Sequence, residues 1–177
     1  TDLMKVLGCG VEINTKHNKD FNSFDINLLR WNKVIICTDA DVDGFQIRTL
    51  ILTMIYRLVP TLIETGKVFI AESPLFEITH KNDTFFAYSE AEKALIVSKF
   101  GDDKYKIQRS KGLGENEPEM MWLTTMNPET RRLIRVEPDD REMTEKMFDL
   151  LLGDNLAGRK DFISQVGSNY IDLADLS

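Results

Sequence analysis

Three aspartates alternate along residues 38–44 of the chain: Asp39, Asp41 and Asp43. In extended backbone every second side chain points the same way, so the three carboxylates can converge on one point. Three carboxylates that close together repel one another, and a divalent cation relieves the repulsion. All-oxygen ligation suits Mg²⁺ or Mn²⁺ better than zinc. The spacing therefore predicts a metal site, and a set of caps for a following helix is the structural alternative.

The segments around these aspartates predict how they are positioned. Residues 34–37 form a short, apolar, β-branched run that is typical of a strand buried on both faces. A helical pattern follows, with one apolar face, and residues 68–71 predict a second buried strand. Strand, helix and strand in this order indicate a right-handed βαβ unit with a parallel sheet. The aspartates then follow the carboxyl end of a strand, where open α/β sheets bind their ligands. The expected apolar face contains Ile47, Leu50, Ile51, Met54, Ile55 and Leu58.

The pattern changes after Pro74. Two β-like runs flank residues 81–83 and predict a hairpin, a short helix is expected over residues 90–100, and a strand over residues 105–108. The remainder is predicted to be mostly helical. Near its end, a stripe at helical spacing is interpreted as core: Met143, Met147, Phe148 and Leu151.

Residues 111–115 read Lys-Gly-Leu-Gly-Glu. Glycines permit close approach of backbone to a partner, and Lys111 with Arg109 supplies positive charge. A plain glycine turn is the simpler interpretation of this motif on its own.

An aspartate-nucleophile phosphatase is a competing functional class, because it also places Asp-x-Asp after a buried strand. Asp39 would then attack phosphorus and Asp41 would act as acid and base. Asp102 and Asp103 could provide a later acidic pair. Spacing alone leaves this alternative open.

The net charge of −7 argues against a protein that covers nucleic acid with its whole surface. It suits a carboxylate-lined metal site with small basic patches. Cys9 and Cys37 are too few for a disulfide framework or a zinc site, and we interpret them as small buried side chains. No apolar window is long enough for a membrane helix, and no signal peptide is recognised. The missing initiator Met suggests a piece of a longer protein.

Taken together, these motifs resemble one family over nearly the whole chain. Residues 38–44 with 47–50 resemble the second acidic motif of the TOPRIM domain in the B subunits of bacterial type IIA topoisomerases, and residues 111–115 resemble a lysine-glycine-leucine-glycine-glutamate motif of the same proteins. Further matches follow the family's order: residues 7–10, 74–76, 124–131 and 153–155. Gyrase is the first choice within this family and topoisomerase IV is the alternative.

The resemblance implies an α/β fold with a Rossmann-like parallel sheet, a small β-rich insertion and a mostly helical tail. The implied domains are a TOPRIM core at residues 1–74, which lacks its N-terminal part, a small Greek-key-like insertion at 75–107, and a tail region at 108–177 that docks on TOPRIM.

The resemblance also implies roles for individual residues. In the family an upstream glutamate and the first two aspartates hold catalytic Mg²⁺, so Asp39 and Asp41 would be the main ligands and Asp43 secondary, with Mn²⁺ or Ca²⁺ as possible substitutes. A tyrosine of the partner A subunit attacks the phosphodiester of double-stranded DNA. Candidate DNA contacts are Arg48, Arg109, Lys111, Arg131, Arg132 and Arg135. For Arg131 and Arg132, a solvated helix end is the alternative.

Three features depart from the family. The Glu-Gly-Asp-Ser motif with the glutamate ligand is absent and is expected before Thr1. Gln46, after Phe45, stands where a histidine after a small residue is expected, and the loop at residues 16–23 is longer than usual. ATPase and transducer regions are also absent, so ATP would bind only to the full-length protein, in a cytoplasmic A2B2 heterotetramer without a membrane. This chain alone is therefore expected to be inactive.

Overall fold

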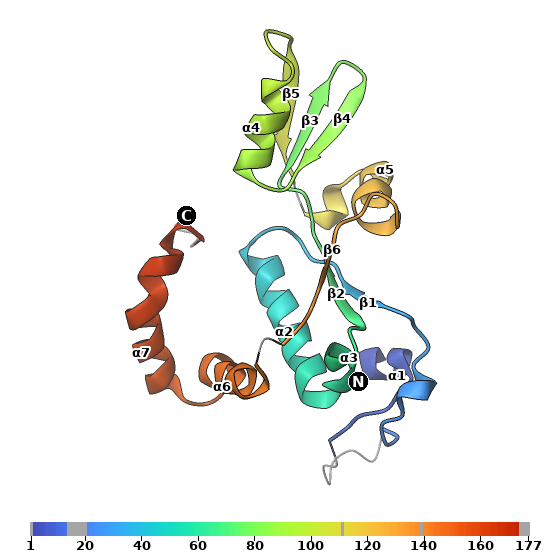
Figure 1. Cartoon of the computed structure of the whole chain (residues 1–177), viewed down its shortest axis with the longest axis vertical. Coiled ribbons are helices and arrows are strands. Elements are labelled where there is room, and N and C mark those ends of the chain that lie inside the picture. Colours follow the sequence, from blue (N-terminus) through green and yellow to red (C-terminus); the bar gives the residue numbers. More distant parts are fainter. Residues whose placement is uncertain (1, 14–20, 111, 139, 174–177) are drawn as a thin grey trace. The chain divides into compact units, whose positions relative to one another are not determined.

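The computed structural model describes residues 2–13, 21–110, 112–138 and 140–173 (Figure 1). The chain divides into two compact units, Thr1–Val136 and Glu137–Ser177. Within the described ranges, no helix is both long enough and apolar enough to span a membrane. His17 and most of the expected long loop lie outside these ranges.

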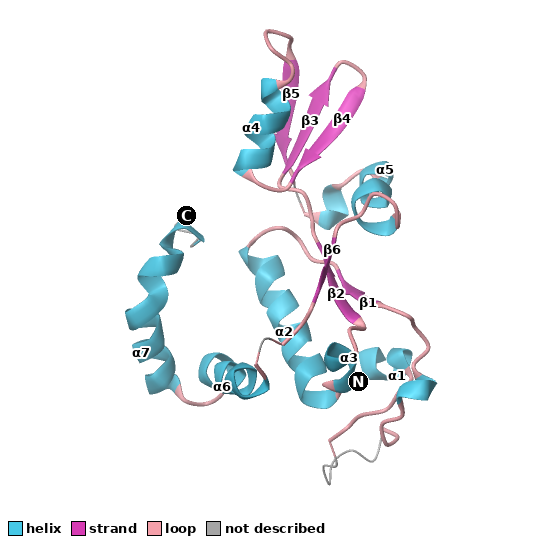
Figure 2. Ribbon diagram, viewed as in Figure 1, coloured by secondary structure: helices cyan, strands magenta, loops and turns pink. Residues whose placement is uncertain are grey.

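A mixed three-stranded sheet forms the centre of the first unit. Strands β1 (Val34–Ile36) and β2 (Val68–Ala71) pair in parallel, with Val34 opposite Val68. This confirms the predicted strand–helix–strand unit. Strand β6 (Leu133–Arg135) pairs antiparallel on the other side of β2, in the order β1-β2-β6 (Figure 2). The sequence predicted no strand there, because β6 has only three residues and two of them are exposed.

Helix α2 (Val42–Leu58) connects the parallel strands and is followed by α3 (Thr61–Glu64), which begins after Pro60. Ile55 is completely buried, whereas Ile47 and Leu50 are 51% and 52% exposed. The predicted apolar face is therefore buried only in its second half. Seventeen helical residues extend about 25 Å at ~1.5 Å each, whereas the three residues of β1 extend about 10 Å. The first half of α2 thus extends past the strands that could cover it.

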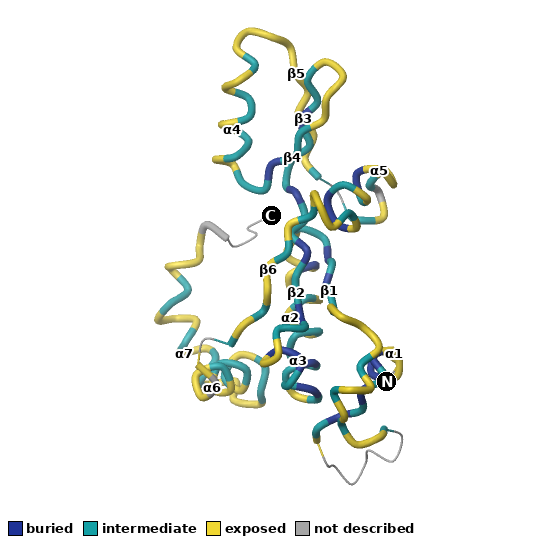
Figure 3. The backbone as a smooth tube through the Cα atoms, turned by 45° about the vertical axis from the view of Figure 1, so that its right-hand side comes forward, coloured by how far each residue is buried: buried dark blue, intermediate teal, exposed yellow. Residues whose placement is uncertain are grey.

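The core of this unit lies between α2, α3, the sheet and the short helix α1 (Asp2–Leu7). Figure 3 shows buried residues, in dark blue, around β2 and α3. Cys9 is fully buried there, as expected, and both cysteines are free thiols. The 3-10 turn η1 (Ile26–Leu28) precedes β1. The fully buried side chains of this core include Ile55, Val59, Leu62 and Val68.

The insertion is a small antiparallel sheet with one helix. Strands β3 (Phe76–His80) and β4 (Asp83–Ala87) form the predicted hairpin, and β5 (Tyr105–Arg109) pairs with the other edge of β3. Helix α4 (Glu90–Ser98) lies against this sheet (Figure 2). The described sheet has three strands, whereas a complete Greek key has four.

The chain then returns to the first sheet through η2 (Leu113–Glu115), α5 (Pro118–Met121) and a π-helical turn, η3 (Trp122–Met126). Strand β6 completes the unit.

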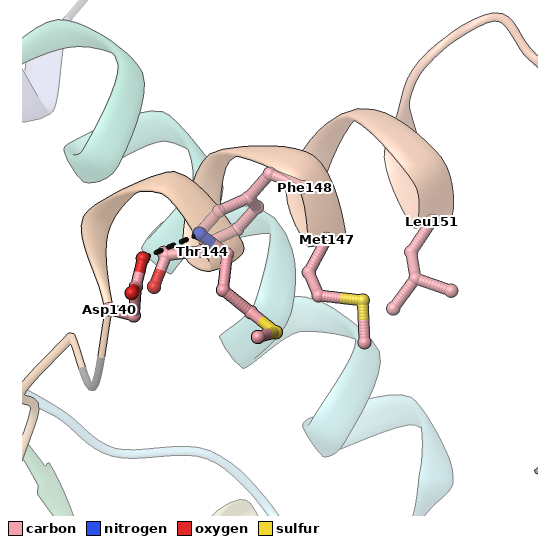
Figure 4. A pocket seen from close by; sticks show the side chains of 6 residues that line it. Asp140, Thr144, Met147, Phe148 and Leu151 are labelled. Carbon is pink, nitrogen blue, oxygen red and sulfur yellow. Dashed lines mark hydrogen bonds between the residues drawn. The ribbon is translucent and has the colours of Figure 1, made fainter.

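The second unit contains α6 (Arg141–Leu152), α7 (Leu156–Val166) and the 3-10 segment η4 (Gly167–Leu173). The stripe on α6 was expected to be core, and this expectation is wrong: Met143 is 64% exposed and Leu151 is 38% exposed. Figure 4 shows Met147, Phe148 and Leu151 along a pocket of 290 Å³. Helical periodicity predicts an amphipathic face, but it does not predict what covers that face.

Candidate functional site

The acidic segment lies where β1 ends and α2 begins. Asp41 is the N-cap of α2, with extended backbone at φ −132° and ψ −179°, and its Oδ1 accepts a 2.7 Å hydrogen bond from the Gly44 amide. Asp43 lies in the first helical turn, and both side chains are exposed. The expected alternation of three aspartates in extended backbone therefore stops at Asp41, because the helix begins at Val42.

Gly44 permits this abrupt change from strand end to helix. It is buried, and a Cβ atom at this position would collide with the backbone carbonyl oxygen of Asp39. The helix can therefore begin directly against the strand end only with glycine here. The sequence-based interpretation did not assign a role to this glycine.

The tail returns to Asp39. The backbone amide of Leu113 donates a 2.6 Å hydrogen bond to Oδ1 of Asp39. A Cβ atom on Gly112 would lie 3.4 Å from Oδ2 of the same carboxylate. The glycine motif therefore approaches the acidic segment at Gly112 and Leu113. Lys111, which was expected to supply charge at this point, lies outside the described residues.

Arg48 extends from α2 toward the same strand end. Its Nη2 donates a 3.3 Å hydrogen bond to Oγ1 of Thr38, and its guanidinium lies 5.1 Å from the centre of the Phe45 ring. Its Nε is buried and has no hydrogen-bond partner in the described part of the chain. Buried donors are nearly always paired, so this atom is an exception within the described residues.

Hydroxyl groups surround the end of β1. Ser73 donates from Oγ to the carbonyl oxygen of Thr38 over 3.0 Å. Burial raises the pKa of the Cys37 thiol, although hydrogen bonding with Thr125 and Ser73 opposes the shift. Cys37 therefore stays a neutral thiol near neutral pH and is a poor nucleophile.

Thr124 and Thr125 are only 2% and 6% exposed, and both belong to the π-helical turn η3. Thr124 donates from Oγ1 to the Met120 carbonyl oxygen over 2.8 Å. The sequence marked this stretch as a family motif but did not predict its burial beside the strand end. Single π-helical turns often occur at functional sites. The spacing of apolar residues in the sequence does not predict where such a turn forms.

The basic candidates have different surroundings. Arg109 is exposed at the end of β5, whereas Arg131 is half-buried after the Asn127 turn, where its amide donates to the Asn127 carbonyl over 3.0 Å. Arg132 already pairs with Glu92 at 2.8 Å. Arg109 lines a groove of 710 Å³ between the insertion and the tail, together with Glu77, Gln108, Ser110, Asn116, Glu117 and Met120.

Asp103, one member of the acidic pair proposed for a phosphatase, lies in the insertion. Its carboxylate pairs with Lys81 at 2.7 Å and with His80 at 3.2 Å. The hydrogen bond from Lys81 is the main cause that lowers the pKa of Asp103, and the hydrogen bond from His80 adds to it. These contacts join the β3–β4 hairpin to the loop between α4 and β5, and this structural role explains them.

The carboxylates can be compared with the needs of a divalent cation. Among the described residues, no group of three or more Asp, Glu, His or Cys side chains could hold a metal ion. The expected convergence of all three aspartates is therefore not found, because Asp43 belongs to the helix. Asp39 and Asp41 still provide hard oxygen donors, and each hydrogen bond described above occupies only one carboxylate oxygen. This donor set fits Mg²⁺, which commonly takes one or two carboxylates and keeps several waters.

Two protein families match the chain. The family described as "Toprim domain" matches residues 3–73, and the family described as "DNA gyrase B subunit, carboxyl terminus" matches residues 102–164.

Individual relatives agree with these matches. The chain is 42% identical over 165 residues to the DNA gyrase B subunit of Thermotoga maritima, and the match covers 93% of this chain and 24% of the relative. It is 45% identical over 152 residues to the DNA gyrase B subunit of Clostridium acetobutylicum, with 85% and 24% covered. For the same protein of Metamycoplasma hominis the identity is 43% over 175 residues, with 98% and 26% covered. The chain thus spans about a quarter of the length of these relatives.

Proposed function

Because the chain belongs to the Toprim family over residues 3–73 and to the gyrase B carboxyl-terminal family over residues 102–164, we propose that it is part of the DNA cleavage and religation core of a type IIA topoisomerase. The parent protein would be a gyrase B subunit. It would act in the cytoplasm on double-stranded DNA, in an A2B2 heterotetramer with the gyrase A subunit. ATP would bind only in the full-length protein.

One contact carries this proposal. The amide of Leu113 bonds to Asp39 across 74 residues of sequence and brings the glycine motif onto the acidic motif. In this arrangement Asp39 and Asp41 would hold Mg²⁺, with Asp43 in an outer role and Mn²⁺ or Ca²⁺ as possible substitutes. The ion held there would supply stabilisation of negative charge on the leaving 3′ oxygen of the cleaved strand.

The chain's own residues would position the DNA around that site. The guanidinium of Arg48, which reaches the Thr38 hydroxyl at this strand end, would donate hydrogen bonds to a phosphate oxygen beside Asp39. Arg109, Lys111 and Arg131 would supply further sequence-independent phosphate contacts. These few cations agree with the net charge of −7, because the A subunit would provide much of the DNA surface.

The attacking tyrosine would come from the A subunit. Tyr88 lies under the guanidinium of Arg132, 3.9 Å from ring centre to Cζ, and burial raises its pKa. Tyr56 is half-buried in α2, and Tyr105 is in a strand of the insertion. We therefore expect this chain alone to leave DNA intact, because no tyrosine in the described structure lies in an identified site for that attack.

The test is a plasmid assay with Mg²⁺, on the chain alone and on a restored heterotetramer that carries the chain within a full-length gyrase B protein. The heterotetramer should form protein-linked breaks and supercoil the plasmid with ATP, and Asp41→Asn should abolish both. Asp161→Asn, a change of equal charge on exposed α7, is the matched control and should leave them unchanged. Breaks made by the chain alone, or an Asp41→Asn heterotetramer with full activity, would refute the proposal.

The same preparations separate the alternatives. A topoisomerase IV protein would decatenate linked circles and would not introduce negative supercoils. A phosphatase would release phosphate from an aryl phosphate, and this activity would disappear in Asp39→Asn. We expect supercoiling and no aryl phosphate turnover.

A further inference from the structure

The two oxygens of the Asp39 carboxylate have different surroundings on the tail side. Oδ1 accepts the 2.6 Å hydrogen bond from the Leu113 amide. Oδ2 faces Gly112, whose missing side chain leaves space: a Cβ atom there would lie 3.4 Å from Oδ2. The tail thus binds one oxygen and leaves room beside the other.

We propose that the Leu113 amide is a positioning group that fixes Asp39 through Oδ1, so that Oδ2 is the oxygen presented to a divalent cation. This inference rests on the metal site proposed above. A carboxylate that is already held loses less side-chain freedom when a cation binds, so the bond should strengthen binding. Coupling between two sites is reciprocal, and the cation should therefore also stabilise the returning tail at η2.

The local backbone allows the amide hydrogen to be removed with little other change. Leu113 is the first residue of η2, a position at which proline is tolerated because its missing N–H has no helical partner. Gly112 has φ −55° and ψ 148°, which is the extended conformation that a residue before proline prefers. Leu113→Pro therefore removes the donor. Leu113→Ala shortens the same side chain but keeps the donor, and it is the matched control.

The first measurement is the affinity of the 177-residue chain for Mn²⁺, titrated by electron paramagnetic resonance. Leu113→Pro should bind Mn²⁺ roughly tenfold more weakly, as expected for loss of a hydrogen bond to a charged group. Leu113→Ala should bind like the unmodified chain. Equal affinity in the two variants, with folding verified by circular dichroism, would overturn the inference.

The second measurement needs no substitution at Leu113. Saturating Mg²⁺ should slow hydrogen exchange of the Leu113 amide in the unmodified chain. Asp39→Asn, which keeps an acceptor oxygen but loses the charge, should remove the effect of Mg²⁺. If Mn²⁺ binds through Asp39 but Mg²⁺ leaves exchange at Leu113 unchanged, the positioning role is wrong and the metal site stands. If Mn²⁺ binding is indifferent to Asp39→Asn, the metal site itself fails, and the inference with it.

Discussion

Arg132 donates a 2.8 Å hydrogen bond from Nη1 to Oε1 of Glu92 and thereby joins the start of β6 to helix α4 of the insertion. The backbone carbonyl of Arg132 accepts a 3.0 Å bond from the amide of Glu72, just after β2. The other oxygen of Glu92 accepts from the Tyr88 amide over 3.0 Å. Arg132 thus connects the central sheet to the insertion. Its guanidinium is already paired with Glu92, although the sequence marked Arg132 as a possible DNA contact.

We predict that Arg132→Ala loosens the insertion more than it lowers global stability. The side chains of Arg132 and Glu92 are 45% and 37% exposed, so their ion pair should contribute no more than about 1 kcal/mol, with about 0.5–1 kcal/mol from the Tyr88 stacking. Hydrogen exchange in α4 should accelerate, and a double-mutant cycle with Glu92→Gln should give a coupling energy of the same small size. Lys104→Ala, an exposed charge in the same insertion, is the control. Unchanged exchange in α4 would contradict this role.

The same contact predicts a pH dependence. The hydrogen bond from Arg132 lowers the pKa of Glu92 below its ordinary value. A carboxylate whose pKa is lowered by folding stabilises the protein above its unfolded pKa, about 4.3, and this stabilisation is lost as the pH falls through the folded pKa. The difference in unfolding free energy between the unmodified chain and Glu92→Gln should therefore be constant from pH 6 to about pH 5 and shrink below about pH 4. Urea unfolding across this range measures it. A difference that grows on acidification would mean that the sign of the shift is wrong.

Gly44→Ala should destabilise the first unit. Alanine in an exposed helix would be favoured over glycine by roughly 1 kcal/mol, but the new Cβ would collide with the carbonyl oxygen of Asp39. Such overpacking typically costs about 1–3 kcal/mol, so we expect a net loss. Gly167→Ala is the control, because its Cβ would meet Ile163 at an ordinary 3.6 Å. Denaturant unfolding of both variants tests the sign, and a Gly44→Ala variant as stable as the parent would show that the strand end can move away.

Local sequence patterns predicted the elements whose own residues show an apolar run, a turn or a helical spacing. The apolar run of β1, the turn residues of the β3–β4 hairpin and the length of α2 are all encoded nearby in sequence. Strand β6 is not, because Ile134 is half exposed and acquires its strand conformation by pairing with Ile70. The partial burial of α2 likewise depends on how short the neighbouring strands are.

The candidate site shows the same limit. The acidic residues were recognisable, but their convergence was over-predicted, because the capping bond of Asp41 starts the helix before Asp43. The bond from Leu113 to Asp39 uses a backbone amide, which every non-proline residue carries. Residue type therefore could not indicate which amide would bind the carboxylate, although the glycine motif indicated where backbone approaches closely.

Asp41 has two proposed roles, and two substitutions should separate them. As N-cap of α2 it accepts the Gly44 amide, and as a candidate ligand it offers negative charge to the cation. Asparagine caps helices about as well as aspartate, whereas alanine costs about 1 kcal/mol. Asp41→Asn should therefore keep the unfolding free energy nearly unchanged, and Asp41→Ala should lower it by about 1 kcal/mol. Both variants lose the charge, so both should bind Mn²⁺ much more weakly than the unmodified chain. Asp161→Asn again controls for net charge. If Asp41→Asn kept its Mn²⁺ affinity while Asp41→Ala lost stability, Asp41 would be a cap alone, and Asp39 would have to find its metal partners elsewhere.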